Sequence, residues 1–182
     1  ICWSLVGSEM CIRDSAQNAA KIVAATDKFM ESDFVKNNFK GSLHLNAYIA
    51  SGKVEETHSF VLLQPSLAEH EIWIAKLNDP NNEEVRKYFS VLNSNSENVG
   101  TRINKFIQNY GTPTNKDTVW VIYPFRTQPS NVGDILEATE DLDKAVKDSF
   151  PGQFNLSERI AGGGMQTHLI TVGYESLAEM EE

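Results

Sequence analysis

Two histidines occupy equivalent places in the chain and are the residues best suited to acid–base chemistry. His58 and His168 each follow a threonine at the start of an apolar stretch. Imidazole exchanges a proton near neutral pH, so either histidine could act as a general base or contact a ligand. The alternative is a histidine at a strand end that makes only a local hydrogen bond. Neither lies in a His-x-His or His-x-x-x-His pattern, so the sequence predicts no metal site and no cofactor.

A second group of polar residues alternates with apolar ones in two short segments. Alternation with a period of two is typical of a strand with one apolar face. The polar face could line a ligand pocket or could face solvent. Its members are His44, Asn46 and Tyr48 in the first segment, and Asn155, Ser157 and Arg159 in the second.

A further predicted strand, Thr118–Thr127, carries aromatic and cationic side chains. Trp120 and Tyr123 could add aromatic walls to a pocket, and Arg126 could attract an acidic ligand. Core packing is the alternative role for Trp120. The glycine-rich segments Ser51-Gly52-Lys53 and Gly162-Gly163-Gly164 are predicted to be hairpin turns, because no helix follows them as a phosphate loop requires.

An internal repeat indicates which elements position these residues. Thr57–Glu71 and Thr167–Glu181 are identical at seven of fifteen positions, including Thr-His and Ser-Leu-Ala-Glu. Six further identities relate Phe39–Val54 to Phe150–Met165 in a register shifted by one residue. The sequence therefore predicts two copies of one supersecondary unit.

Each copy is predicted to contain two strands followed by a helix. The strands are Ser42–Ala50 and Thr57–Gln64 in copy one, and Gln153–Ala161 and Thr167–Tyr174 in copy two. In both copies the Ser-Leu-Ala-Glu motif has the spacing of a capping box, which predicts a helix start. The first of these helices is expected to end near Leu77.

Helices are also predicted before and between the strands. They cover Ala16–Asn37, Glu83–Leu92, a stripe of apolar residues from Val99 to Tyr110, and Asn131–Phe150, with a polar loop over Ser94–Asn98. Copy one has no predicted first strand, and neither copy has an obvious fourth strand. The predicted organisation is copy one over residues 16–111 with extra C-terminal helices, a linker over 112–117, and copy two over 118–182.

The strand that begins with Thr-His and leads into Ser-Leu-Ala-Glu, present twice, resembles the dimeric α/β-barrel superfamily. That superfamily includes antibiotic-biosynthesis-monooxygenase-like and NIPSNAP-like domains. The resemblance covers about 39–77 and 118–182. It implies an α+β fold of tandem ferredoxin-like units, strand–helix–strand–strand–helix, that form a pseudo-dimeric α/β barrel truncated at both ends. It also implies a ligand space between two facing sheets.

The first fifteen residues have a different character from the rest. Leu5–Ser15, LVGSEMCIRDS, resembles the translation of a sequencing adapter and indicates a bacterial metagenomic fragment. Residues 1–15 are accordingly interpreted as non-native, and a genuine leader segment is the alternative. Both cysteines, Cys2 and Cys11, lie in this segment, so the remainder can form no disulfide and has no thiol nucleophile.

Composition excludes some classes of function. A net charge of −9 argues against nucleic-acid binding, and no apolar run is long enough to span a bilayer. The main hypothesis is a small-molecule-binding protein of unknown activity. One alternative, implied by the resemblance, is a cofactor-independent monooxygenase-like enzyme acting on an apolar substrate, with His58 or His168 as base. Another is a purely structural pairing module. Enzymatic activity, a homo-oligomer, and a cytoplasmic or exported location all stay open.

Overall fold

The computed structural model describes residues 6–50, 55–111, 116–147, 149–150, 152–162 and 164–181. These residues form two compact units, unit 1 over residues 1–103 and unit 2 over residues 104–182. The boundary falls inside a long strand. Most of the predicted linker, and the turn at Ser51-Gly52-Lys53, lie outside the described residues.

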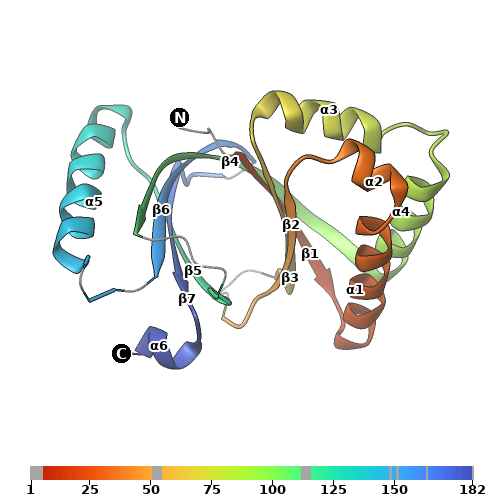
Figure 1. Cartoon of the computed structure of the whole chain (residues 1–182), viewed down its shortest axis with the longest axis horizontal. Helices are drawn as coiled ribbons and strands as arrows, with labels where there is room; N and C mark the ends of the chain where they lie inside the picture. The colour runs from red at the N-terminus through yellow and green to blue at the C-terminus, as the bar shows by residue number, and fades with distance from the viewer. Residues whose placement is uncertain are drawn as a thin grey trace. The chain divides into compact units, whose positions relative to one another are not determined.

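Unit 1 is an antiparallel sheet with helices on one face (Figure 1). Its strand order is β2-β3-β1-β4. Along the chain the elements are β1 (Val6–Asp14), α1 (Ala16–Met30), α2 (Asp33–Asn38), β2 (Ser42–Ala47), β3 (His58–Gln64), α3 (Leu67–Leu77), α4 (Glu83–Asn95) and β4 (Ser96–Gly111).

Unit 2 continues from the second half of β4 and has the strand order β4-β6-β7-β5. Helix α5 covers one face of its sheet (Figure 1). Its further elements are β5 (Val119–Phe125), a 3-10 turn (Pro129–Asn131), α5 (Val132–Val146), β6 (Gln153–Ala161), β7 (His168–Tyr174) and α6 (Leu177–Glu181).

The five strands that the sequence analysis predicted are present as β2, β3, β5, β6 and β7. Helices α3 and α6 also start where the repeated Ser-Leu-Ala-Glu motif indicates. The Oγ atoms of Ser66 and Ser176 accept hydrogen bonds from the backbone N–H of Glu69 and Glu179, each at 3.2 Å. The glutamates differ, because Glu69 pairs with Lys40 whereas Glu179 reaches back to the backbone N–H of Glu175.

The segment from Val99 to Tyr110 is a strand, so the helix predicted there is wrong. Strand β4 runs through it and is the neighbour of β1 in unit 1 and of β6 in unit 2. Its β-branched and aromatic residues suit a strand, and ladder hydrogen bonds to two neighbours outweigh a spacing that also fits a helix. The predicted polar loop, Ser94–Asn98, is instead the end of α4 and the start of β4.

The structure forms a strand, β1, where the sequence analysis placed none in copy one. Residues from Val6 to Ile12 pair with β3 in a continuous antiparallel register. Strand pairing is open to native and foreign segments alike, so the adapter interpretation stays a prediction. The predicted helix Ala16–Asn37 is divided into α1 and α2, because Ser32 ends the first and caps the second by accepting from the backbone N–H of Val35.

The repeated threonines make the same backbone contacts in both units. Thr57 Oγ1 accepts from the backbone N–H of Asp14, and Thr167 Oγ1 accepts from that of Thr127, each at 3.0 Å. The backbone N–H of Thr57 donates to Ile12 and that of Thr167 to Phe125. Each threonine therefore joins the ends of two adjacent strands, which gives a physical reason for its place in the repeat.

The repeated glycines also share one structural cause. A Cβ on Gly41 would lie 2.1 Å from the carbonyl oxygen of Leu63, and one on Gly152 would lie 2.5 Å from that of Gly173. Both contacts are shorter than a side chain tolerates. Only glycine lets the chain pass this close to the neighbouring strand.

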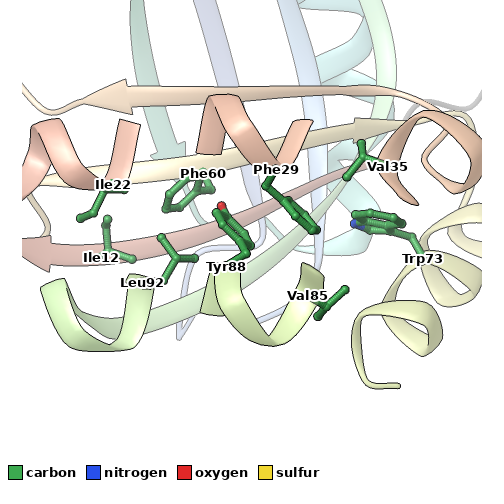
Figure 2. Close-up of a cluster of buried hydrophobic side chains, with 9 residues drawn as sticks. All are labelled: Ile12, Ile22, Phe29, Val35, Phe60, Trp73, Val85, Tyr88 and Leu92. Carbon is green, nitrogen blue, oxygen red and sulfur yellow. The ribbon is translucent and has the colours of Figure 1, made fainter. Parts of the chain in front are cut away.

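The core of unit 1 lies between the sheet and its helices (Figure 2). The Phe29 ring stacks on Tyr88 at 4.3 Å between centroids and lies 6.4 Å from the Trp73 ring. Unit 2 has a smaller core in which Tyr110 stacks on Phe154 at 4.8 Å. Burial of these rings supplies much of the hydrophobic stabilisation of each unit.

Candidate functional site

An apolar cavity of about 170 Å³ lies between the sheet and the helices of unit 1. Aromatic and aliphatic side chains form most of its wall, among them Phe29, Phe60, Leu62 and Tyr88. An apolar cavity of roughly 150 Å³ is known to stay dry and to accept benzene. The space therefore suits a molecule with one aromatic ring.

Trp73 contributes an unpaired hydrogen-bond donor to this region. The residue lies on α3, is 3% exposed, and its Nε1 atom is buried without a hydrogen-bond partner. In Figure 2 the indole nitrogen lies on the side of the ring turned toward Phe29. A buried N–H without an acceptor costs about 1–3 kcal/mol, so a ligand oxygen that accepts from it would bind favourably.

His70 contributes the complementary acceptor. It precedes Trp73 by three residues on α3, a spacing that puts both on one helix face, and both line the cavity. Its Nδ1 lies 2.7 Å from Oε1 of Gln64, whose amide nitrogen points to the carbonyl of Glu69. Because Oε1 only accepts, Nδ1 carries the proton. Burial lowers the pKa of His70, so the ring is neutral and Nε2 is free to accept a proton.

The opposite face of the same sheet carries a compact charged cluster. Arg102 on β4 donates to Glu56 at 2.6 Å and lies 3.6 Å from Glu9, which accepts from the hydroxyl of Tyr48 at 2.7 Å. Burial and the Glu9 carboxylate raise the pKa of Tyr48 above its ordinary range. Burial alone would lower the pKa of Arg102, but the two carboxylates raise it. The cluster therefore keeps Tyr48 neutral and Arg102 charged.

Cys11 lies beside this cluster in contact with Arg102. Burial, with help from the Glu9 carboxylate, raises the pKa of the thiol to about 11. The sulfur is therefore a neutral thiol near pH 7, and its nucleophilicity is low because the thiolate is the reactive form. Cys2 lies outside the described residues.

The two predicted catalytic histidines have different surroundings. His58 Nδ1 lies 2.7 Å from a carboxylate oxygen of Asp14, whose side chain is 1% exposed, whereas His58 itself is 21% exposed. His168 Nδ1 lies 3.0 Å from Thr167 Oγ1, and its ring stacks on Phe125. His168 is 6% exposed. A carboxylate partner therefore distinguishes the histidine of unit 1.

The polar residues predicted to line a pocket remain separate in the structure. In unit 1, His44 is exposed and contacts Ser42, Asn46 is exposed, and Tyr48 joins the charged cluster. In unit 2, Ser157 donates to Asn155 at 3.1 Å and both are buried. Arg159 donates to Asn104 at 3.1 Å. Their role in ligand binding stays a prediction.

The aromatic and cationic residues predicted on β5 lie at the surface of unit 2. Trp120 is 39% exposed and Tyr123 is 54% exposed. Arg126, just after the strand, is exposed. The interpretation of Trp120 as a core residue is wrong, because β5 is the last strand of the sheet order and its ring packs only against Gly173 of the neighbouring strand.

Sequence reasoning missed the two polar residues of the cavity. His70 and Trp73 were assigned simply to the helix that follows Ser66. Their spacing of three residues on an otherwise apolar helix was the available signal. Within the described ranges, no three His, Cys, Asp or Glu side chains are grouped in a way that could hold a metal ion. None of the helices in the same ranges is long and apolar enough to cross a bilayer.

Solved structures share the fold of this chain at low sequence identity. An anthrone oxidase-like protein matches with a TM-score of 0.67 and 12% identity over 99% of this chain and 76% of that one. A candidate monooxygenase of Lactobacillus acidophilus matches at 0.65 and 8% over 98% and 80%. A chlorite dismutase variant of Candidatus Nitrospira defluvii matches at 0.57 and 8% over 97% and 79%.

These neighbours are of the α/β-barrel type to which antibiotic-biosynthesis-monooxygenase-like domains belong. At such identities the likeness concerns the fold alone, since one fold carries many chemistries. A scan against protein-family models finds no match, and no curated protein matches the chain.

Proposed function

We propose that the protein is a small-molecule-binding protein of the α/β-barrel type, and that unit 1 binds a one-ring aromatic molecule. The apolar cavity with its unpaired Trp73 donor is the observation that carries this proposal. The sequence analysis expected a ligand between two facing sheets, whereas this cavity lies between the sheet and the helices of unit 1.

A hydroxyl group on the ring suits the two polar groups of the wall. It can accept from Trp73 Nε1–H and donate to His70 Nε2, so one oxygen satisfies both. An isosteric methyl group satisfies neither. Each hydrogen bond contributes about 0.5–1.5 kcal/mol net. We therefore expect phenol to bind more tightly than toluene by about 1–3 kcal/mol, the sum of both.

A monooxygenase-like reaction is the second candidate. Neutral His70 could take the hydroxyl proton of a phenol, and the Trp73 N–H could stabilise the phenolate that remains. The phenolate would then be the electron donor and molecular oxygen the oxidant. The names of two structural neighbours, an anthrone oxidase-like protein and a candidate monooxygenase, agree with this class.

Calorimetric titration of the whole chain with phenol and with toluene tests the binding proposal. Trp73→Phe should reduce the preference for phenol about tenfold or less and leave toluene binding nearly unchanged. Trp120→Phe is the matched control, because that indole is exposed on unit 2. Leu62→Phe should fill the cavity and weaken both ligands. Equal affinity of phenol in wild type and Leu62→Phe would refute the site. Oxygen consumption with bound phenol would separate the enzyme from the binding protein.

A further inference from the structure

We propose that Asp14 and His58 form a histidine–carboxylate dyad that accepts acyl groups from activated esters and passes them to water. This site would be separate from the cavity, whose wall includes neither residue. Asp14 belongs to the segment that resembles an adapter translation, so the proposal concerns the chain with the printed sequence.

The geometry fixes the protonation of the His58 ring. The Asp14 carboxylate only accepts, so the His58 Nδ1 atom, 2.7 Å away, carries the hydrogen. In the neutral ring Nε2 is therefore unprotonated. Within the part of the chain that the structure describes, Nε2 has no hydrogen-bond partner, and the side chain is partly exposed. An oriented, accessible imidazole nitrogen is what a nucleophile or general base requires.

The carboxylate is held rigidly behind the ring. Thr57 Oγ1 donates to the same oxygen of Asp14 and accepts from the backbone N–H of that residue. The Asp14 side chain is 1% exposed. A buried, fixed carboxylate stabilises the positive charge that the imidazole gains when Nε2 forms a bond. Asp14 is thus the positioning residue and His58 the reacting one.

Unit 2 shows that joining the strand ends does not require this acid. There Thr127 takes the place of Asp14 and donates its backbone N–H to Thr167 at the same 3.0 Å. His168 has only a threonine hydroxyl at Nδ1 and is more deeply buried than His58. The same strand contacts therefore form without a carboxylate, so the acid in unit 1 is an addition to the structural frame.

The proposed step balances without a further reagent. With p-nitrophenyl acetate, Nε2 forms a bond to the acyl carbon, the ester C–O bond breaks, and p-nitrophenolate leaves. Nδ1–H stays on Asp14 and stabilises the acyl-imidazolium. Water then attacks the acyl carbon, the bond to Nε2 breaks, and acetate and one proton are released.

Two experiments on the whole chain test the dyad. In the first, diethyl pyrocarbonate modifies the histidines and mass spectrometry measures the rate at each one. His58 should react faster than the more exposed His44, and Asp14→Asn should slow His58 about tenfold or more. Glu97→Gln removes one negative charge from the exposed pair with Arg13 and should leave the rate at His58 unchanged. Faster reaction of His44 in the wild type, or an unchanged His58 rate in Asp14→Asn, would overturn the proposal.

The second experiment measures hydrolysis of p-nitrophenyl acetate. His58→Gln should lower the rate by about 100-fold, whereas Glu97→Gln should not change it. Asp14→Asn can retain the hydrogen bonds with Thr57, so it keeps the test valid if His58→Gln fails to fold. Hydrolysis by the wild type that is no faster than that of free imidazole at equal concentration would also overturn the proposal.

Discussion

The hydrogen bond between Thr26 and Tyr88 predicts unequal costs for its two partners. Thr26 Oγ1 donates its hydrogen to the carbonyl of Ile22 at 2.8 Å, so the contact of 3.2 Å must have the Tyr88 hydroxyl as donor. Tyr88→Phe removes this donor and leaves the Thr26 hydroxyl bonded to Ile22. The expected loss in unfolding free energy is about 1 kcal/mol.

Thr26→Val should cost more, because it leaves a buried hydroxyl without an acceptor. Valine has the shape of threonine, so packing hardly changes, and Tyr88 is 9% exposed. An unsatisfied buried donor costs about 1–3 kcal/mol. The double variant removes the orphan hydroxyl, so it should be more stable than Thr26→Val alone.

Urea unfolding followed by Trp73 fluorescence measures these differences for unit 1. The chain has three tryptophans, and a Trp3→Phe/Trp120→Phe background leaves Trp73 as the reporter. The reasoning is refuted if Tyr88→Phe costs as much as Thr26→Val, or if the two losses add in the double variant. Unit 2 offers a repetition, since Tyr110 and Thr139 make the same contact at 2.8 Å while Thr139 donates to Ile135.

Three further predictions concern pH and the repeated threonines. Burial raises the pKa of Tyr88 to about 12 from 10.0; the unfolded chain loses this proton first, so unit 1 should lose about 2–3 kcal/mol of stability between pH 10 and 12. Tyr88→Phe should lack that loss, and equal pH slopes would contradict the assignment. Burial lowers the pKa of His70 from 6.5, so its contribution to stability is complete above pH 6.5 and falls as the pH drops below it. Unfolding measured from pH 7 to 5 should show a smaller decrease in His70→Gln, and an undiminished decrease would count against burial of a neutral ring. Thr57→Val and Thr167→Val each remove the acceptor of one backbone N–H and should cost about 1–2 kcal/mol. Hydrogen exchange at Asp14 and Thr127, respectively, should accelerate, whereas unchanged exchange would refute the shared role.

Much of the fold follows from local patterns. The alternation of β2 and β6 and the serine caps of α3 and α6 are signals within a few residues, and the structure confirms them. Strand β4 could not be predicted, because its apolar positions fit both periods. Only its pairing with β1 and β6 decides the conformation, and that pairing depends on residues distant in sequence.

The candidate site was less predictable than the fold. Trp73 looked like an ordinary core residue, and its missing acceptor is visible only when the surrounding side chains are placed. Asp14 was excluded because its segment was interpreted as foreign, although β1 brings it to His58. The equivalence of His58 and His168 came from the repeat, but their different partners depend on residues outside it.

The indole N–H resonance of Trp73 tests the central claim most directly. In the Trp3→Phe/Trp120→Phe background, a nitrogen-15 correlation spectrum contains this one indole signal, which can be followed during a titration with phenol. The account predicts a saturable downfield displacement of the N–H proton, a smaller one with toluene, and a strongly weakened one in Leu62→Phe. An indole signal that does not move with phenol, or that moves equally in Leu62→Phe, would contradict the binding of an aromatic ligand in the cavity of unit 1.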